Sequence, residues 1–141
     1  MWRRDVWSIG DRLGTLAVLE FNLAEGRWRG ANALGGTWNL PHSETHTIVL
    51  PHVVAYNYAA APQAMMRIER AMGNSNAANG IFDLMMQLDA PLSLKEIGMR
   101  HDDLDRSASL VMEAPYYNPR STTCEGILRL LDDAFFGRRP K

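Results

Sequence analysis

The chain has 141 residues and a formal net charge of −1, from 15 basic and 16 acidic residues. Hydrophobic residues make up 46% of the sequence, which suffices for the core of one domain of ordinary size. A balanced charge attracts neither nucleic acid nor an anionic membrane surface, so the composition argues against both partners. Cys124 is the only cysteine, which rules out an intrachain disulfide and favours a reducing, cytoplasmic compartment.

The N-terminal part of the sequence gives weak structural signals. Its early arginines are followed by no sustained apolar run and no small-residue cleavage site, so no signal peptide is predicted. No stretch of the chain approaches the roughly 18 to 20 consecutive apolar residues that cross a bilayer, so we expect no membrane span. The run from Thr15 to Phe21 is apolar but too short to distinguish a buried strand from a turn of helix.

From Asn39 onward the pattern is helical. A buried helix is expected from Pro41 to about Ala60, with a kink or a break at Pro51, because proline cannot donate a backbone hydrogen bond. Further helices are expected over Pro62–Met72 before Gly73, Asn76–Leu88, Ser93–Ile97, Asp102 or Asp103 to Glu113, and Ser121 or Thr122 to Gly137. About six helical segments without an alternating strand pattern predict an all-α fold, a helical bundle.

Several side chains on these helices are expected to be buried. The methionines should fill the core rather than bind a cofactor; they are Met65, Met66, Met85 and Met86. Cys124 falls in the first turn of the last helix, and we expect it to be buried as a small apolar residue rather than reactive.

Two of the four histidines have a spacing that suits a metal ion. His42 and His46 lie four residues apart, so on a helix they share one face. The alternative is that each imidazole donates or accepts a structural hydrogen bond and performs no chemistry. The segment H-S-E-T-H is not the H-E-x-x-H motif of zinc proteases, and the chain contains no glycine-rich nucleotide motif and no G-x-S-x-G elbow.

Two segments carry a resemblance to a known family. LGGTWNLPHSETHTIVLPHVVAYN, residues 34–57, resembles the central signature of the maleylacetate reductases within the iron-containing alcohol dehydrogenase family. YYNPRSTTCEGILRLLDDAFFGRRP, residues 116–140, resembles the same family's Asn-Pro-Arg turn and final helix. The resemblance covers roughly residues 31–140, so we expect a helical dehydrogenase-like C-terminal domain over 31–141 and an unplaced segment over 1–30.

The resemblance implies an oxidoreductase. This family joins an α/β domain that binds NAD(P)H to a helical domain that carries active-site histidines, and its maleylacetate reductase branch reduces maleylacetate to 3-oxoadipate during the breakdown of aromatic compounds. His42 matches the Pro-His motif, whose histidine is a metal ligand in the alcohol dehydrogenases. His46 matches the Glu-Thr-His of the reductase branch, which implies that it faces the substrate. His42 and His46 are therefore the catalytic candidates, and His42 is the metal candidate.

The sequence also departs from the family pattern. The family's two other nearby histidines lie about 14 and 10 residues before the Pro-His histidine, where this chain has Trp28 and Asn32. The remaining ligands would fall before Met1. Because a catalytic metal needs about three protein ligands, we expect weak metal binding at most and no NAD or NADP binding by this chain alone. NAD(P)H and a divalent metal belong to the complete family enzyme.

Three functions remain open at this stage. The chain is the helical half of such a reductase, working with a separate nucleotide-binding chain; or it is a non-catalytic helical remnant or interaction module of a truncated gene; or His42 and His46 serve an unrelated activity. We also expect a homo-oligomer, because loss of a covering domain should expose apolar surface at Trp38, Leu40 and Tyr116–Tyr117. Residues 1–30 should cover part of that surface.

Overall fold

The computed structural model describes residues 36–113 and 118–141, and within them the fold is all-α, as predicted. The α-helices are α3 (His42–Asn57), α4 (Pro62–Met72), α5 (Ala77–Gln87), α6 (Leu104–Glu113) and α7 (Cys124–Phe136). Two 3₁₀ turns, η2 (Tyr58–Ala60) and η3 (His101–Asp103), precede α4 and α6. None of the helices in the described residues is long and apolar enough to cross a membrane. The apolar run at residues 15–21 lies outside the described residues.

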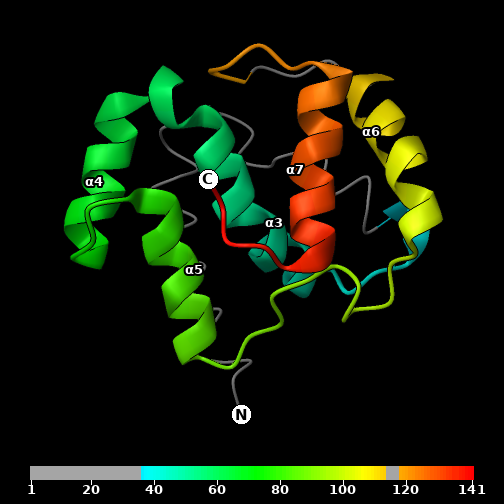
Figure 1. Ribbon diagram of the computed structural model, residues 1–141, viewed down its shortest axis with the longest axis horizontal. Helices are drawn as coiled ribbons and strands as arrows, with labels where there is room; N and C mark the ends of the chain where they lie inside the picture. Colours follow the sequence, from blue (N-terminus) through cyan, green and yellow to red (C-terminus); the bar gives the residue numbers. More distant parts are fainter. Residues whose placement is uncertain (1–35, 114–117) are drawn as a thin grey trace.

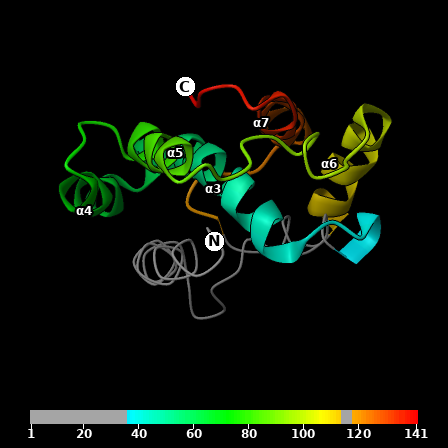
Figure 2. The ribbon, with the colours of Figure 1, turned by 90° about the horizontal axis from the view of Figure 1, so that it is seen from below.

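Helix α3 is the central element of the bundle. It packs against α5 on one side and α7 on the other, while α4 covers α5 and α6 covers α7 (Figure 1). Seen from below, the helices follow one another in the order α4, α5, α3, α7, α6 (Figure 2). A helix with neighbours on two sides must be apolar on more than one face, and Ile48, Val49 and Val54 of α3 are all at most 1% exposed.

Pro51 does not break this helix. The sequence predicted either a kink or a break at this proline. The structure excludes the break, because α3 runs without interruption from His42 to Asn57. Pro51 itself is buried. In a central helix, packing against α5 and α7 supplies most of the stability, so the loss of one backbone hydrogen bond is tolerated.

The ends of the other helices follow the expected chemistry. The Asn76 side chain accepts a hydrogen bond from the Asn79 amide at 2.9 Å, and Thr123 accepts one from the Gly126 amide at 3.1 Å. Thr123 is therefore the cap of α7, one or two residues later than predicted. Gly73 and Gly137 end α4 and α7 with φ angles of 62° and 64°, a left-handed conformation that favours glycine.

The predicted helix over residues 93–97 is a hydrogen-bonded turn instead. The Ser93 hydroxyl does accept from the Glu96 amide at 3.2 Å, but the Glu96 carboxylate accepts from the Leu92 amide at 2.9 Å. The Leu94 amide donates to the Ala134 carbonyl of α7 at 3.0 Å, so this segment is held by a helix distant in sequence. That tertiary contact, and Gly98 at a φ of 100°, explain why no helix propagates here.

Burial was predicted for four methionines and for Cys124, and the prediction was wrong for Met66, Met86 and Cys124. Met65 and Met85 are buried, but Met66 and Met86 are 58% and 40% exposed, because adjacent residues on a helix point about 100° apart. Cys124 is exposed rather than buried. It occupies the first residue of α7, beyond the reach of the core.

The apolar residues expected to lie on an exposed face pack within the chain where they are described. Leu40 is 8% exposed and belongs to the core. Trp38 is half-buried, and its indole nitrogen donates to the Ser107 hydroxyl at 2.8 Å. Residues 116 and 117 lie outside the described residues. Trp38 and Leu40 are therefore not an exposed oligomerisation patch.

Candidate functional site

The first turn of α3, which carries His42 and His46, is fixed by short polar contacts. The Pro41 carbonyl accepts both the Thr45 amide at 2.9 Å and the Thr45 hydroxyl at 2.7 Å. The Thr47 hydroxyl donates to the Ser43 carbonyl at 2.8 Å. No capping side chain is bonded at Pro41, so these internal contacts define where the helix begins.

The two candidate histidines occupy one side of this turn. His42 is the first residue of α3, and the position of its side chain lies outside what the structure describes. His46 lies one helical turn later and is half-buried. The helical backbone thus places the two residues one turn apart on the same side of α3. Their shared role in catalysis stays a prediction.

Glu44 projects from the other side of the same turn. Two residues on a helix differ by about 200° around the axis, so the Glu44 carboxylate points away from the side that carries His42 and His46. Its Oε2 accepts the Ser43 hydroxyl at 2.6 Å. Glu44 is therefore poorly placed to complete a metal site with the two imidazoles.

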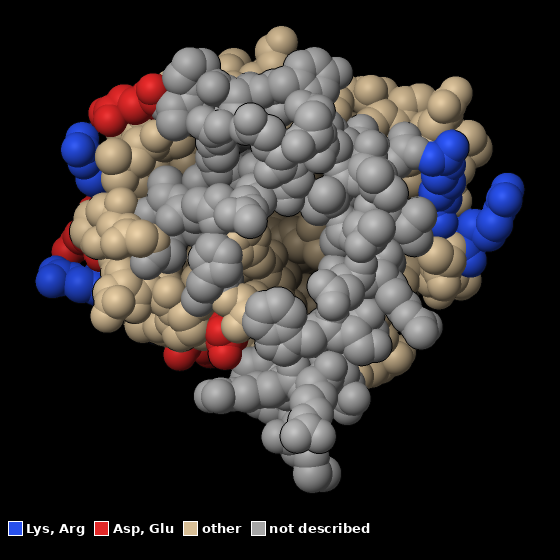
Figure 3. All heavy atoms as spheres, turned by 180° about the vertical axis from the view of Figure 1, so that it is seen from behind, with Lys and Arg blue, Asp and Glu red and all other residues tan. Residues whose placement is uncertain are grey.

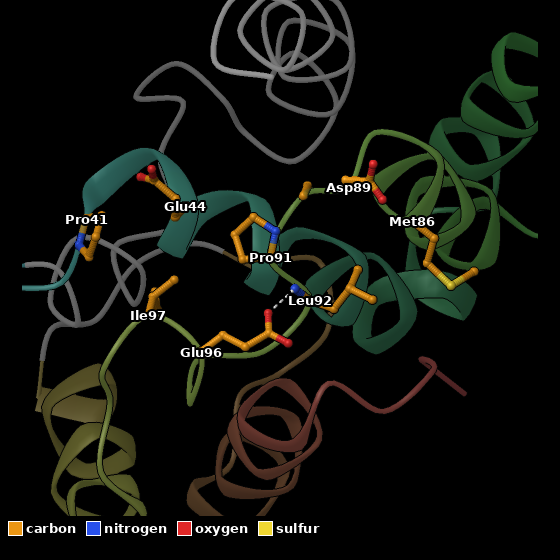
Figure 4. Close-up of a pocket in the computed structure, with 9 residues that line it drawn as sticks. Pro41, Glu44, Met86, Asp89, Pro91, Leu92, Glu96 and Ile97 are labelled. Atoms are coloured by element: carbon orange, nitrogen blue, oxygen red, sulfur yellow. Dashed lines mark hydrogen bonds between the residues drawn. The ribbon is translucent and has the colours of Figure 1, made fainter. Parts of the chain in front are cut away.

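Glu44 instead lines an open cavity of about 570 Å³ between the start of α3, the end of α5 and the following loop (Figure 4). The cavity is lined by Pro41, Glu44, Met86, Asp89, Ala90, Pro91, Leu92, Glu96 and Ile97. Glu44, Asp89 and Glu96 give this lining three carboxylates and no basic side chain. Such a lining disfavours an anionic ligand, so the cavity does not suit a carboxylate substrate.

His52 is the histidine that the sequence analysis passed over. It lies in the middle of α3, is 4% exposed, and its Nε2 is buried without a hydrogen-bond partner among the described residues. Burial lowers the pKa of His52 from 6.5 to about 4, although the nearby Asp133 carboxylate opposes the shift. The imidazole is therefore neutral at pH 7. Its position within the apolar run IVLPHVVAY was the signal that it would be buried.

His101 lies in a different environment from the other histidines. It is exposed in η3, and its Nε2 lies 3.7 Å from an Asp132 carboxylate oxygen. Its ring makes edge contact with Phe135 at 5.3 Å between centroids. These contacts attach η3 to the end of α7, so His101 has a structural role that explains its position.

The described residues do not by themselves fit a catalytic metal. Among the side chains described in residues 36–113 and 118–141, which do not include that of His42, no group of three or more His, Cys, Asp or Glu could hold a metal ion. Positions 28 and 32, where the resemblance would place two more ligands, lie outside the described residues.

Charged side chains of the described residues do not gather in one place on the face opposite that of Figure 1 (Figure 3). On the face opposite that of Figure 1, the acidic and basic side chains of the described residues lie toward the edge, with both signs represented (Figure 3). Their arrangement agrees with the balanced composition of the chain. No strongly charged patch on this part of the surface indicates a polyanionic partner.

The sequence and the fold together define the family. The model for the Fe-containing alcohol dehydrogenase family, C-terminal, matches residues 14–135, and the chain belongs to this family. Maleylacetate reductase of Pseudomonas sp. (strain P51) is 43% identical over 136 residues, which is 96% of this chain and 37% of that protein. Maleylacetate reductase of Burkholderia cepacia is 46% identical over 135 residues, 95% of this chain and 36% of that protein.

A solved structure shows the same helical arrangement. Maleylacetate reductase from Agrobacterium tumefaciens superposes with a TM-score of 0.75 at 41% identity, covering 79% of this chain and 31% of that one. The chain thus spans about a third of the length of these relatives. The family match begins at residue 14, so the family pattern extends into the segment 1–30 that the sequence analysis left unplaced. The boundary at residue 30 stays a prediction.

Proposed function

We propose that this chain forms the helical part of a maleylacetate reductase-like oxidoreductase. The observation that carries the proposal is the match of almost the whole chain, at 43 to 46% identity, to proteins named maleylacetate reductase. The α3 segment that contains His42 and His46 lies within the matched region. The nucleotide-binding part would come from another stretch of polypeptide, either in the same protein or in a separate chain.

The proposed reaction is the NAD(P)H-dependent reduction of maleylacetate to 3-oxoadipate. Hydride from the nicotinamide and one proton from solvent or a side chain together saturate the carbon–carbon double bond. His46 would contact the substrate, and its imidazole can donate a hydrogen bond to a carboxylate or supply a proton. His42 would be one ligand of a divalent metal where the complete enzyme has one. Neither NAD(P)H nor a metal is assigned to this chain alone.

The proposed cellular setting follows from the same resemblance. An enzyme that uses NAD(P)H works where that cofactor is made, so we place the protein in the cytoplasm. A homo-oligomer and a contact with the nucleotide-binding part are the proposed interactions. We expect neither nucleic acid nor membrane as a partner, in line with the balanced charge.

The test is reconstitution. The oxidation of NADH with maleylacetate is measured for the chain alone and for the chain mixed with a separately expressed nucleotide-binding domain of the Burkholderia cepacia relative. We expect turnover only in the mixture. His46→Ala should lower kcat at least about a hundredfold, the usual size of a proton-transfer contribution, while His101→Gln serves as the matched control. Absence of turnover in both samples rules out the proposal.

A second candidate is a non-catalytic helical module. It is favoured by Trp28 and Asn32, which stand where the family resemblance leads one to expect histidines. In that case the reconstituted mixture would form a complex by size-exclusion chromatography or light scattering and still fail to oxidise NADH. An unrelated activity of His42 and His46 would instead appear in the chain alone and be lost in His42→Ala.

A further inference from the structure

The segment that leads into α3 is bound to α6 by a buried hydroxyl. Ser107 lies on α6 and is 1% exposed. Its hydroxyl donates to the Asp103 carbonyl at 2.6 Å and accepts the indole N–H of Trp38 at 2.8 Å. Figure 2 shows the segment that starts at residue 36, in cyan, beside α6. Trp38 and Ser107 therefore join two segments that are 69 residues apart in the sequence.

The path from Trp38 to the first turn of α3 contains no free joint. Asn39 has a φ of 52°, a left-handed conformation that few residues other than glycine adopt and that asparagine tolerates. Leu40 is 8% exposed within the core. The ring of Pro41 fixes its φ, at −57°, and its carbonyl accepts both the amide and the hydroxyl of Thr45. A displacement of Trp38 is therefore passed on to the start of α3.

The side-chain hydrogen bonds of the threonines in this first turn are local. Thr45 and Thr47 donate to carbonyls four residues earlier, and no side chain caps the helix at Pro41. Such bonds shape the turn but do not fix it against the neighbouring helices. A misplacement of about 1 Å in a group that contacts substrate can cost about a hundredfold in rate. The placement of His46, in the same turn, thus depends on what holds the chain just before α3.

We propose that Trp38 and Ser107 are positioning residues: their hydrogen bond fixes the first turn of α3 relative to α6, and with it His46. The kinetic part of this inference rests on the proposed reductase function, in which His46 contacts the substrate. Neither Trp38 nor Ser107 is assigned a contact with substrate or cofactor, so both act through the backbone that leads to His46. The alternative is that their bond stabilises α6 and leaves the first turn of α3 unaffected.

Hydrogen exchange of backbone amides, followed by NMR in the full chain, tests the positioning directly. Ser107→Ala removes the acceptor of the bond, and Trp38→Phe removes its donor. Each change should accelerate exchange at the Thr45 and His46 amides about fivefold, the effect of losing one neutral hydrogen bond. The double variant should exchange at about the rate of either single variant, because both changes remove the same bond.

Ser109→Ala is the matched control. The Ser109 hydroxyl also donates to a carbonyl four residues earlier on α6, that of Asp105 at 3.0 Å, but the indole N–H is bonded to Ser107. Thr123→Ala, which removes the cap of α7, controls for a general loss of stability. In both controls the same two amides should exchange within about twofold of their rates in the unmodified chain.

Two results of the exchange measurement overturn the proposal. One is unchanged exchange at the two amides in Ser107→Ala, and the other is an equal acceleration in Ser109→Ala. If the tryptophan variant does not fold, Ser107→Ala and its controls still decide the outcome.

The kinetic consequence is measured in a fusion in which this chain replaces the C-terminal part that it matches in the Burkholderia cepacia relative. With maleylacetate and NADH, Ser107→Ala should lower kcat about tenfold and leave the KM for NADH unchanged, while Ser109→Ala keeps both. An unchanged kcat in Ser107→Ala would overturn the positioning of His46 for the reaction. No turnover in the unmodified fusion would instead contradict the proposed reductase function, and the exchange rates would still decide whether Trp38 and Ser107 position the turn.

Discussion

The two ends of α3 differ in how their polar groups are satisfied. At the C-terminal end, Asn57 is fully buried and exchanges hydrogen bonds with Asn118 at 2.8 and 3.0 Å, and it also accepts the Arg120 amide at 3.1 Å. At the N-terminal end, the first turn bonds mainly to itself and borders an open cavity lined by carboxylates. The buried polar side chain at the C-terminal end therefore finds its hydrogen-bond partners within this chain. Our proposal places the contacts with substrate and the rest of the enzyme at the N-terminal end, on the side of α3 that carries His42 and His46 and away from this acidic cavity.

The largest expected effect on stability is at the C-terminal end of α3. Asn57→Ala removes both halves of the exchange with Asn118 and leaves the Arg120 amide without its acceptor. We expect a loss of about 3 to 4 kcal/mol in the free energy of unfolding, measured by urea denaturation. Gln87→Ala, at an exposed position of α5, is the control and should stay within about 0.5 kcal/mol.

A double-mutant cycle sharpens this prediction. Asn118→Ala breaks the same pair of side-chain hydrogen bonds, so Asn57→Ala combined with Asn118→Ala should cost clearly less than the sum of the single changes. Additive losses would mean that the two side chains do not act as a unit. This result would contradict the claim that the hydrogen-bonded pair of Asn57 and Asn118 stabilises the C-terminal end of α3.

The next effect is a dependence of stability on pH at the middle of α3. Burial lowers the pKa of His52 to about 4 in the folded chain, against 6.5 in the unfolded chain, so the unfolded chain takes up a proton first as the pH falls. The stabilisation is therefore complete above about pH 6.5 and is lost progressively toward pH 4, by up to about 3 kcal/mol.

Comparing the chain with His52→Leu separates the contribution of His52 from that of the carboxylates that titrate in the same pH range. The free energy of unfolding is measured at pH 7 and pH 4.5 for the chain and for His52→Leu. We expect the variant to lose less on acidification, and the difference is the His52 contribution. An identical loss in the two proteins would show that His52 is not buried in the neutral form.

A smaller effect is expected at the start of α7. Thr123→Ala removes the side-chain acceptor of the Gly126 amide and should cost about 1 kcal/mol. Thr123→Ser keeps the hydroxyl oxygen and should recover most of that loss. Thermal unfolding followed by circular dichroism at 222 nm provides the comparison, and equal losses in both variants would rule out a capping role for the side chain.

The smallest effect on stability is expected at the N-terminal end of α3. His46 is half-buried, and His46→Ala should cost less than about 1 kcal/mol, far less than Asn57→Ala, because the site serves binding more than packing. Urea denaturation of the two variants side by side checks the ranking. A loss at His46 as large as that at Asn57 would make the N-terminal end a structural element and weaken its assignment as a site.

The sequence predicted the helices well and the polar contacts between distant segments poorly. Pro62, Gly73 and Gly137 act locally, so the ends of α4 and α7 could be read from single residues. The turn over 93–97 could not, because it depends on a hydrogen bond to Ala134 of α7. The same holds for the candidate site: the spacing of His42 and His46 is local, whereas the burial of the unpaired Nε2 of His52 depends on the helices that pack around α3.

The most direct test of the account places this chain in the Burkholderia cepacia maleylacetate reductase in exchange for the C-terminal part that it matches, 36% of that protein. Circular dichroism and light scattering first establish that the resulting fusion is folded, and the oxidation of NADH with maleylacetate is then measured. We predict turnover that is lost in His46→Ala and kept in His101→Gln. A folded fusion that binds NADH but does not oxidise it with maleylacetate would contradict the account.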